Sequence, residues 1–240
     1  MISEPLFRIT YSFRLSETEV VSFDLAFDPT MRLLCDQPHP PPDWTRLGQH
    51  QCVACPLTPE QAPHCPAALN LAPLVSNFEH LLSHDEIFLE VITEERKISQ
   101  QTTIQRAVSS LMGLLMAASD CPRTRFFKPM ARFHLPLASE EETIYRAAAT
   151  YMLTQYFRNR QGRQPDFALD GLNEIYRNIQ EVNSAMAKRL RGVTKSDSSV
   201  NAIILLDMYA KAMPYAIKQA LEELAYLFSE DPPSITGGAP

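Results

Sequence analysis

Three cysteines between residues 52 and 65 form the pattern with the most chemical content in this sequence. Cys52 and Cys55 are two residues apart, so that one metal ion could contact both thiolates, and Cys65 follows after nine intervening residues. A closed structural zinc site takes four nitrogen or sulfur ligands. The sequence therefore predicts a metal site that contains these three cysteines. The fourth ligand is expected to be Cys121, with His64 and His50 as alternatives.

The spacing leaves the identity of the metal open. Cys55, Cys65 and Cys121 are each followed by proline, and a Cys-Pro pair also occurs at the ligands of iron–sulfur clusters. Closed cysteine sites more often hold zinc, so zinc is the first expectation and an iron–sulfur cluster is the alternative. A further alternative is that these cysteines are thiols without a metal. Cys35 has no neighbouring partner in the sequence and is expected to be a spare thiol.

Arg132 and His134 are a second pair of candidates, in a short segment between two expected helices. They could contact an anion or another ligand, and His134 could also serve as a general base. A structural hydrogen bond is the simpler interpretation, because no nucleophile stands at a recognisable spacing from His134. The sequence contains no G-x-S-x-G, P-loop, G-x-G-x-x-G or kinase motif. An enzyme with a pocket between helices near this pair is therefore a weak alternative.

The cysteines must be positioned by an unusual segment of the chain. The sequence has 240 residues with 19 prolines and 7 glycines, and nine of the prolines lie in residues 38–73. Proline is excluded from helix interiors and central strands, so this segment is predicted to be a stiff irregular loop. Long irregular loops are uncommon in compact domains unless something holds them. The loop is thus a second argument for a bound metal.

The hydrophobic pattern on either side of the loop differs. Alternation with period two over residues 6–13 and 19–27 predicts a β-hairpin, and residues 86–98 predict a further strand or hairpin. A short helix is expected near residues 71–83, and from residue 100 the period becomes helical. Capping residues place the starts of four helices near Thr102, Ser139, Asp170 and Ser198. Pro214 is expected to kink the last of these helices.

These elements predict an α+β fold. A small N-terminal antiparallel sheet, with the proline-rich cysteine loop, is expected to pack on a C-terminal bundle of four to five helices. The expected parts are a β-rich part over residues 1–100 with the loop at 38–73, a helical bundle over 101–228 and a disordered tail over 229–240. With Cys121 as the fourth ligand, the metal would join the first two parts.

Charge and hydropathy limit the expected partners. Residues 1–100 hold 6 basic and 14 acidic residues, residues 101–240 hold 16 and 14, and the net charge is −6. Nucleic-acid binding needs a strong basic excess, so no nucleic-acid partner is expected, and the basic group Lys188, Arg189 and Arg191 is expected to be a solvated helix face. No apolar stretch suits a signal peptide or a membrane span, which predicts a cytoplasmic protein with reduced thiols.

The residues around the cysteines form a longer pattern, which is His50-x-Cys52-x-x-Cys55-Pro56-Leu57, His64-Cys65-Pro66-x-Ala68-x-Asn70-Leu71, Cys121-Pro122 and Met130-x-Arg132-Phe133-His134-Leu135-Pro136. This pattern resembles that of an uncharacterised bacterial family of unknown function, over residues 44 to 228. The resemblance implies no known activity. It does imply that the four cysteines at 52, 55, 65 and 121 act together, and Cys35 lies outside it.

The sequence therefore favours a metal-stapled cytosolic protein of unknown activity with a regulatory or interaction role. An iron–sulfur redox or sensor protein is the main alternative, and an enzyme near Arg132 and His134 is the weaker one. A protein partner or a second copy of the chain would fit the first of these functions.

Overall fold

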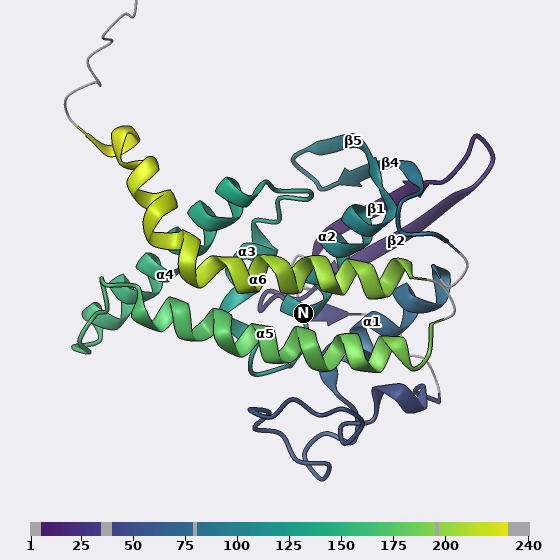
Figure 1. Cartoon of the computed structure of the whole chain (residues 1–240), viewed down its shortest axis with the longest axis horizontal. Helices are drawn as coiled ribbons and strands as arrows, with labels where there is room; N and C mark the ends of the chain where they lie inside the picture. Colours follow the sequence, from purple (N-terminus) through teal and green to yellow (C-terminus); the bar gives the residue numbers. More distant parts are fainter. Residues whose placement is uncertain (1–5, 35–39, 79–80, 195–196, 230–240) are drawn as a thin grey trace, which may run out of the picture.

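The computed structural model describes residues 6–34, 40–78, 81–194 and 197–229. Within them a sheet lies against a group of helices, as Figure 1 shows. The predicted α+β class is confirmed. Cys35 and residues 230–240 of the expected tail lie outside the described residues, so the expectations for them stay predictions.

The sheet is antiparallel and has the strand order β3-β2-β1-β4-β5. Its central strand β1 pairs with β2, as in the predicted hairpin, and on its other side with β4. One face of β1 is closed to solvent through Ile9, Tyr11 and Phe13, which are fully buried. The strand bounds are Phe7–Arg14 for β1, Val20–Phe27 for β2, Leu33–Leu34 for β3, Glu86–Ile92 for β4 and Lys97–Thr103 for β5.

The helices follow in the second half of the chain, apart from α1. The long helix α6 packs against α2, α4 and α5, and Figure 1 shows α5 and α6 side by side. Pro214 lies inside α6, and the helix changes direction part-way along. The helix bounds are Pro66–Asn77 for α1, Ile104–Ala117 for α2, Lys128–Arg132 for α3, Glu140–Arg160 for α4, Asp170–Arg191 for α5 and Ser198–Glu223 for α6, with the short 3-10 turns η1 (Asp43–Thr45), η2 (Arg125–Phe127) and η3 (Ala225–Phe228).

The irregular cysteine loop is shorter than predicted. Residues 66–73, expected to belong to the loop, are the first turns of α1, which ends at Asn77 rather than near residue 83. The prolines explain the error. Pro66 occupies the first turn, where its missing N–H costs nothing, and Pro73 is tolerated inside the helix. The last cysteine of the loop, Cys65, therefore stands directly at the N-terminus of a buried helix.

Two of the predicted helix starts are also wrong in detail. Strand β5 continues to Thr103, so Thr102 lies within the sheet, and Thr103 precedes α2 without a side-chain cap. Asp170 is the first residue of α5 rather than its N-cap. The N-cap position is taken by Leu169, which has a backbone φ of 65°. The capping box of Ser139 and Glu142 at α4 is confirmed.

Buried side chains from the sheet and from the helices form a single hydrophobic cluster. Tyr11 and Phe13 of the sheet belong to it, as do Leu111 of α2, Tyr176 of α5 and Ile203 of α6. The two expected parts of the chain therefore share one core. The irregular loop packs at one border of this core, through Trp44.

Candidate functional site

Cys52, Cys55, Cys65 and Cys121 line one small cavity, although they come from three separate segments of the chain. The cavity has a volume of about 20 Å³, which is room for a particle the size of one water molecule. Half of its other lining residues come from α5, among them Val182, Met186 and Arg189. All four cysteines are free thiols, three of them partly exposed and Cys121 buried.

The turn between Cys52 and Cys55 is held from outside the loop. The backbone N–H of Cys55 donates to the Cys52 carbonyl over 3.0 Å, which closes the turn. The carbonyl of Ala54 accepts from the Arg123 guanidinium, with 2.7 Å to Nε. The Ala54 N–H donates to the Glu181 carboxylate over 3.2 Å. Both backbone groups of one residue are thus bound by side chains of distant elements, which fixes the direction of the turn.

Cys65 is placed by the 3-10 turn η1. Its backbone N–H donates to the Thr45 carbonyl over 2.7 Å, and the Thr45 hydroxyl bonds Nδ1 of His64 over 2.7 Å. His64 is therefore engaged with Thr45, and His50 is exposed with φ 48. Neither histidine lines the cavity, whereas Cys121 does. Of the three candidates for the fourth ligand, the structure brings Cys121 together with the other cysteines.

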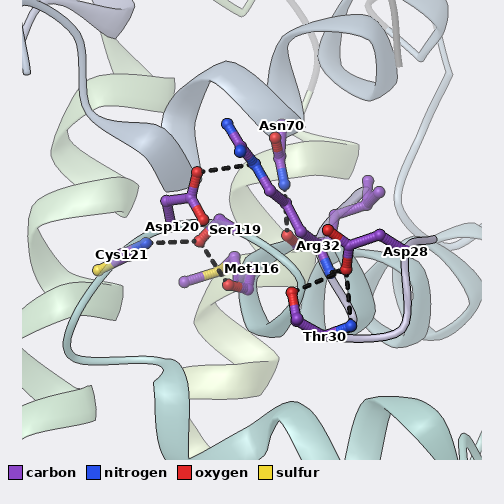
Figure 2. Close-up of polar contacts among 9 residues, drawn as sticks. Asp28, Thr30, Arg32, Asn70, Met116, Ser119, Asp120 and Cys121 are labelled. Atoms are coloured by element: carbon purple, nitrogen blue, oxygen red, sulfur yellow. Dashed lines mark hydrogen bonds and ion pairs between the residues drawn. The ribbon is translucent and has the colours of Figure 1, made fainter. Parts of the chain in front are cut away.

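Cys121 follows α2 and is held by a small polar network (Figure 2). The Ser119 hydroxyl accepts from the Cys121 N–H over 3.3 Å and donates to the Met116 carbonyl over 2.7 Å. Next to it, the Asp120 carboxylate pairs with Arg32 at 2.9 Å. Arg32 lies in the turn between β2 and β3, so the sheet also contributes to the position of Cys121.

Arg189 of α5 is a buried charged residue in the wall of the site. It is 2% exposed and donates three hydrogen bonds to carbonyls of the loop, at 2.8 Å to Trp44, 2.7 Å to Arg46 and 2.9 Å to Leu47. Burial lowers the pKa of Arg189, and the nearby cysteines oppose that shift. The prediction that Arg189 belongs to a solvated face is wrong. Its place three residues after Met186, on the apolar stripe of α5, was the signal in the sequence.

Burial disfavours the thiolate form of two of the four cysteines, Cys52 and Cys121. Burial raises the pKa of Cys52 to about 12, and Cys65, Cys121 and Cys55 add to the shift, while Arg189 opposes it. Burial likewise raises the pKa of Cys121. Among the described residues, no three His, Cys, Asp or Glu side chains are arranged as a ready ligand group for a metal ion. The four cysteines thus share a cavity without standing in a coordination geometry.

The second predicted pair separates in the structure. His134 bonds the Tyr11 hydroxyl through Nε2, and this hydroxyl also lies 3.0 Å from the Ser110 hydroxyl. Burial, with the charge of Arg146, lowers the pKa of His134 to about 3, so its imidazole is neutral. Arg132 points elsewhere, with its guanidinium 4.1 Å from the centre of the Phe7 ring. Of the two, His134 alone lines a larger cavity, of about 220 Å³, beside α2, α5 and α6.

Residues 9–229 match the family model described as Domain of unknown function (DUF6901). The chain belongs to this family. No curated protein and no solved structure matches the chain. The family description names no activity, so function has to be argued from the residues themselves. In the part of the chain that the structure describes, no helix has the length and the apolar character that crossing a membrane requires.

Proposed function

We propose that Cys52, Cys55, Cys65 and Cys121 bind one zinc ion, which ties the irregular loop to the end of α2 as a structural staple. The observation that carries this proposal is that four thiols from three segments line a single water-sized cavity. Structural zinc in proteins is held by four such ligands in a tetrahedron. The cysteine side chains would have to move towards a central ion, because no three described ligands stand as a ready group.

The surroundings suit a thiolate–metal group. Four thiolates with one Zn²⁺ carry a net charge of −2, and the cavity is lined by two arginines, Arg123 and Arg189. Zinc stabilises the deprotonated thiol, so it would offset the raised pKa of Cys52 and Cys121. The backbone bonds at Ala54 and Cys65 would hold two of the three ligand segments in place before the ion arrives.

A set of four cysteines favours a structural ion over a catalytic one. Catalytic zinc keeps an open coordination position for water or substrate, and four thiolates leave none. A structural ion fits a protein with a regulatory or interaction role, in which the stapled turn forms a rigid part of the surface. Val53 at the tip of this turn is 96% exposed, so the turn presents an apolar side chain to a partner.

An iron–sulfur cluster is the second candidate, supported by the prolines that follow three of the cysteines. The volume argues against it. A cluster brings several iron and sulfide atoms, and a cavity of about 20 Å³ holds about one water-sized particle. The loop would have to move outward to admit a cluster, whereas it can stay in place around a single ion.

The test is metal analysis of the anaerobically purified full chain, combined with an absorption spectrum. One zinc per chain and a colourless protein are expected, whereas brown protein with bound iron would overturn zinc in favour of a cluster. Cys121→Ser and Cys55→Ser are expected to lose the zinc. Cys35→Ser is the matched control and should keep it. A folded protein that stays metal-free after incubation with Zn²⁺, with all of its thiols titratable, would overturn both the zinc and the iron–sulfur proposal.

A further inference from the structure

The larger cavity, of about 220 Å³, is separate from the cysteine site and has a different character. Most of its wall is apolar, with Leu114 and Met116 of α2, Ile179 of α5 and Leu206 of α6 among the residues that line it. An apolar cavity of roughly 150 Å³ is enough to hold benzene. The space in this protein is therefore large enough for a ring with a short side chain.

Three buried polar side chains interrupt the apolar wall. Ser109 of α2 is 4% exposed, Tyr176 of α5 is 5% exposed and Asn183 of α5 is 2% exposed, and all three line the cavity. None of them forms a side-chain hydrogen bond with another described residue, although the charge of Arg146 acts on Tyr176. Their polar atoms are not among the fully enclosed and unpartnered side-chain atoms of the described residues, so they reach the open space of the cavity. Hydrogen-bond donors from α2 and α5 thus line the cavity and are open to a ligand inside it.

The charges that line the cavity have one sign. Arg106 and Arg146 line it, and none of the described residues that line it is acidic. Arg146 is positioned by the Met130 and Phe133 carbonyls, at 2.7 and 2.9 Å. His134, the third titratable nitrogen group in the wall, is neutral. The cavity therefore favours a negatively charged group over a neutral or a positive one.

We propose that this cavity binds a small monocarboxylate with an apolar body, of the size of an arylpropionate. The apolar wall accepts the body, and the carboxylate lies near the arginines and accepts hydrogen bonds from the buried amide or hydroxyl donors. Size supports this class, because the cavity is smaller than the roughly 300 Å³ at which pockets for drug-sized ligands begin. The site does not depend on the cysteines.

The test is calorimetric titration of the full chain with three probes of one shape: 3-phenylpropionate, 3-phenylpropanol and 3-phenylpropylamine. The carboxylate is expected to bind at least about tenfold more tightly than the alcohol, as charge-assisted hydrogen bonds are about twice as strong as neutral ones. The amine is expected to bind weakest. Equal affinity for acid and alcohol, or no binding of the acid, would overturn the proposal.

Two variants test whether the probes bind inside the cavity. Gly113 lines it, and an added Cβ would meet Leu206 at an ordinary 3.7 Å, so Gly113→Leu should fold and fill the space. This variant is expected to abolish binding of acid and alcohol alike. Asn183→Leu should weaken binding of the acid by about tenfold and leave binding of the alcohol unchanged. Acid binding that survives Gly113→Leu unchanged in a folded variant would overturn the proposal.

The contribution of charge is tested with a matched pair of exposed arginines. Arg106→Gln is expected to weaken binding of the acid by only about threefold, because Arg106 is exposed and solvent screens its charge. Arg96→Gln, in the turn between β4 and β5 and away from the cavity, should have no effect. An equal effect of the two variants would contradict the assignment of the carboxylate to this site.

Discussion

Arg189 shows how a single charged side chain organises the cysteine site. A guanidinium in the interior is costly unless its donors are satisfied, and here three loop carbonyls accept them. Around the turn η1, the Arg46 carbonyl also accepts from the Gln49 N–H, whereas the backbone bonds of this segment leave the Trp44 and Leu47 carbonyls to Arg189. Arg189 therefore supplies hydrogen-bond donors to backbone carbonyls of the loop, as a neighbouring strand does within a sheet.

We expect Arg189→Met to destabilise the protein by about 3 kcal/mol, because it leaves buried carbonyls without donors. Urea unfolding of the variant and the wild type at pH 7 measures the difference. Arg191→Met, at an exposed position of the same helix, is the control and should stay within about 0.5 kcal/mol of wild type. Equal destabilisation by both variants would contradict the role given to Arg189.

At this scale the spacing in the sequence singled out Cys52, Cys55 and Cys65, and Cys121 was the first of three candidates for a fourth ligand. It did not predict the side chains that hold them. Arg123, Glu181 and Arg189 reach the loop from elements 69 to 145 residues away, and nothing local marks such contacts. A charged residue on an apolar helix stripe, as at Arg189, is the one pattern that points to a buried partner.

Single elements were predictable where the chemistry is local. The start of α4 follows from Ser139 and Glu142, whose reciprocal hydrogen bonds need no other part of the protein. The start of α2 was misplaced because the ladder of β5 with β4 continues to Thr103 and competes for the residues of the expected cap. Pairing between strands thus overrode a local helix signal.

A second element junction is made by Asp197, immediately before α6. Its carboxylate accepts hydrogen bonds from the backbone N–H and the hydroxyl of Ser83, both at 2.9 Å, and from the Asn201 amide at 2.9 Å. The bond from the Ser83 N–H is the largest cause that lowers the pKa of Asp197 below the ordinary 3.8. The ionised carboxylate thus joins the segment before β4 to the start of α6.

This junction should give acid-dependent stability. Because the folded-state pKa lies below 3.8, the stabilisation is present above the unfolded pKa and is lost as pH falls through the folded one. Because Asp197 is exposed and solvent screens its interactions, we expect Asp197→Asn to cost at most about 1 kcal/mol at pH 7. The difference from wild type should shrink towards zero below the folded-state pKa. Urea unfolding over a pH series measures it, with Glu17→Gln, an exposed carboxylate, as control; a difference independent of pH would contradict the assignment.

At the scale of the whole molecule, composition and periodicity were enough for the fold class. The order of the strands was not available from them, because β1 pairs with β4 across more than 70 residues and no local pattern records that pairing. Nor could the sequence show that the sheet and the helices share one core. Both features arise only when the hydrophobic faces meet.

The proposed zinc staple makes a prediction for the whole chain. Removal of zinc with a chelator should raise hydrogen exchange in residues 40–65 by at least about tenfold, while β1 and β4 stay protected. Hydrogen–deuterium exchange with mass spectrometry measures both regions in one sample. Cys55→Ser should show the fast loop exchange with and without chelator. Uniform loosening of the chain, or no change, would contradict a local staple.

The distance along the chain between the cysteine turn and its supports has a consequence for synthesis on the ribosome. Cys52 and Cys55 emerge long before Arg123, Glu181 and Arg189, the residues that hold their loop. At the usual pace of translation, the interval from Cys52 to Arg189 lasts on the order of ten seconds. During that time the two thiols are exposed to metal ions, to oxidants and to each other. The loop therefore receives all of its supporting side chains only once α5 has been made, and until then its two thiols stay open to these reactions.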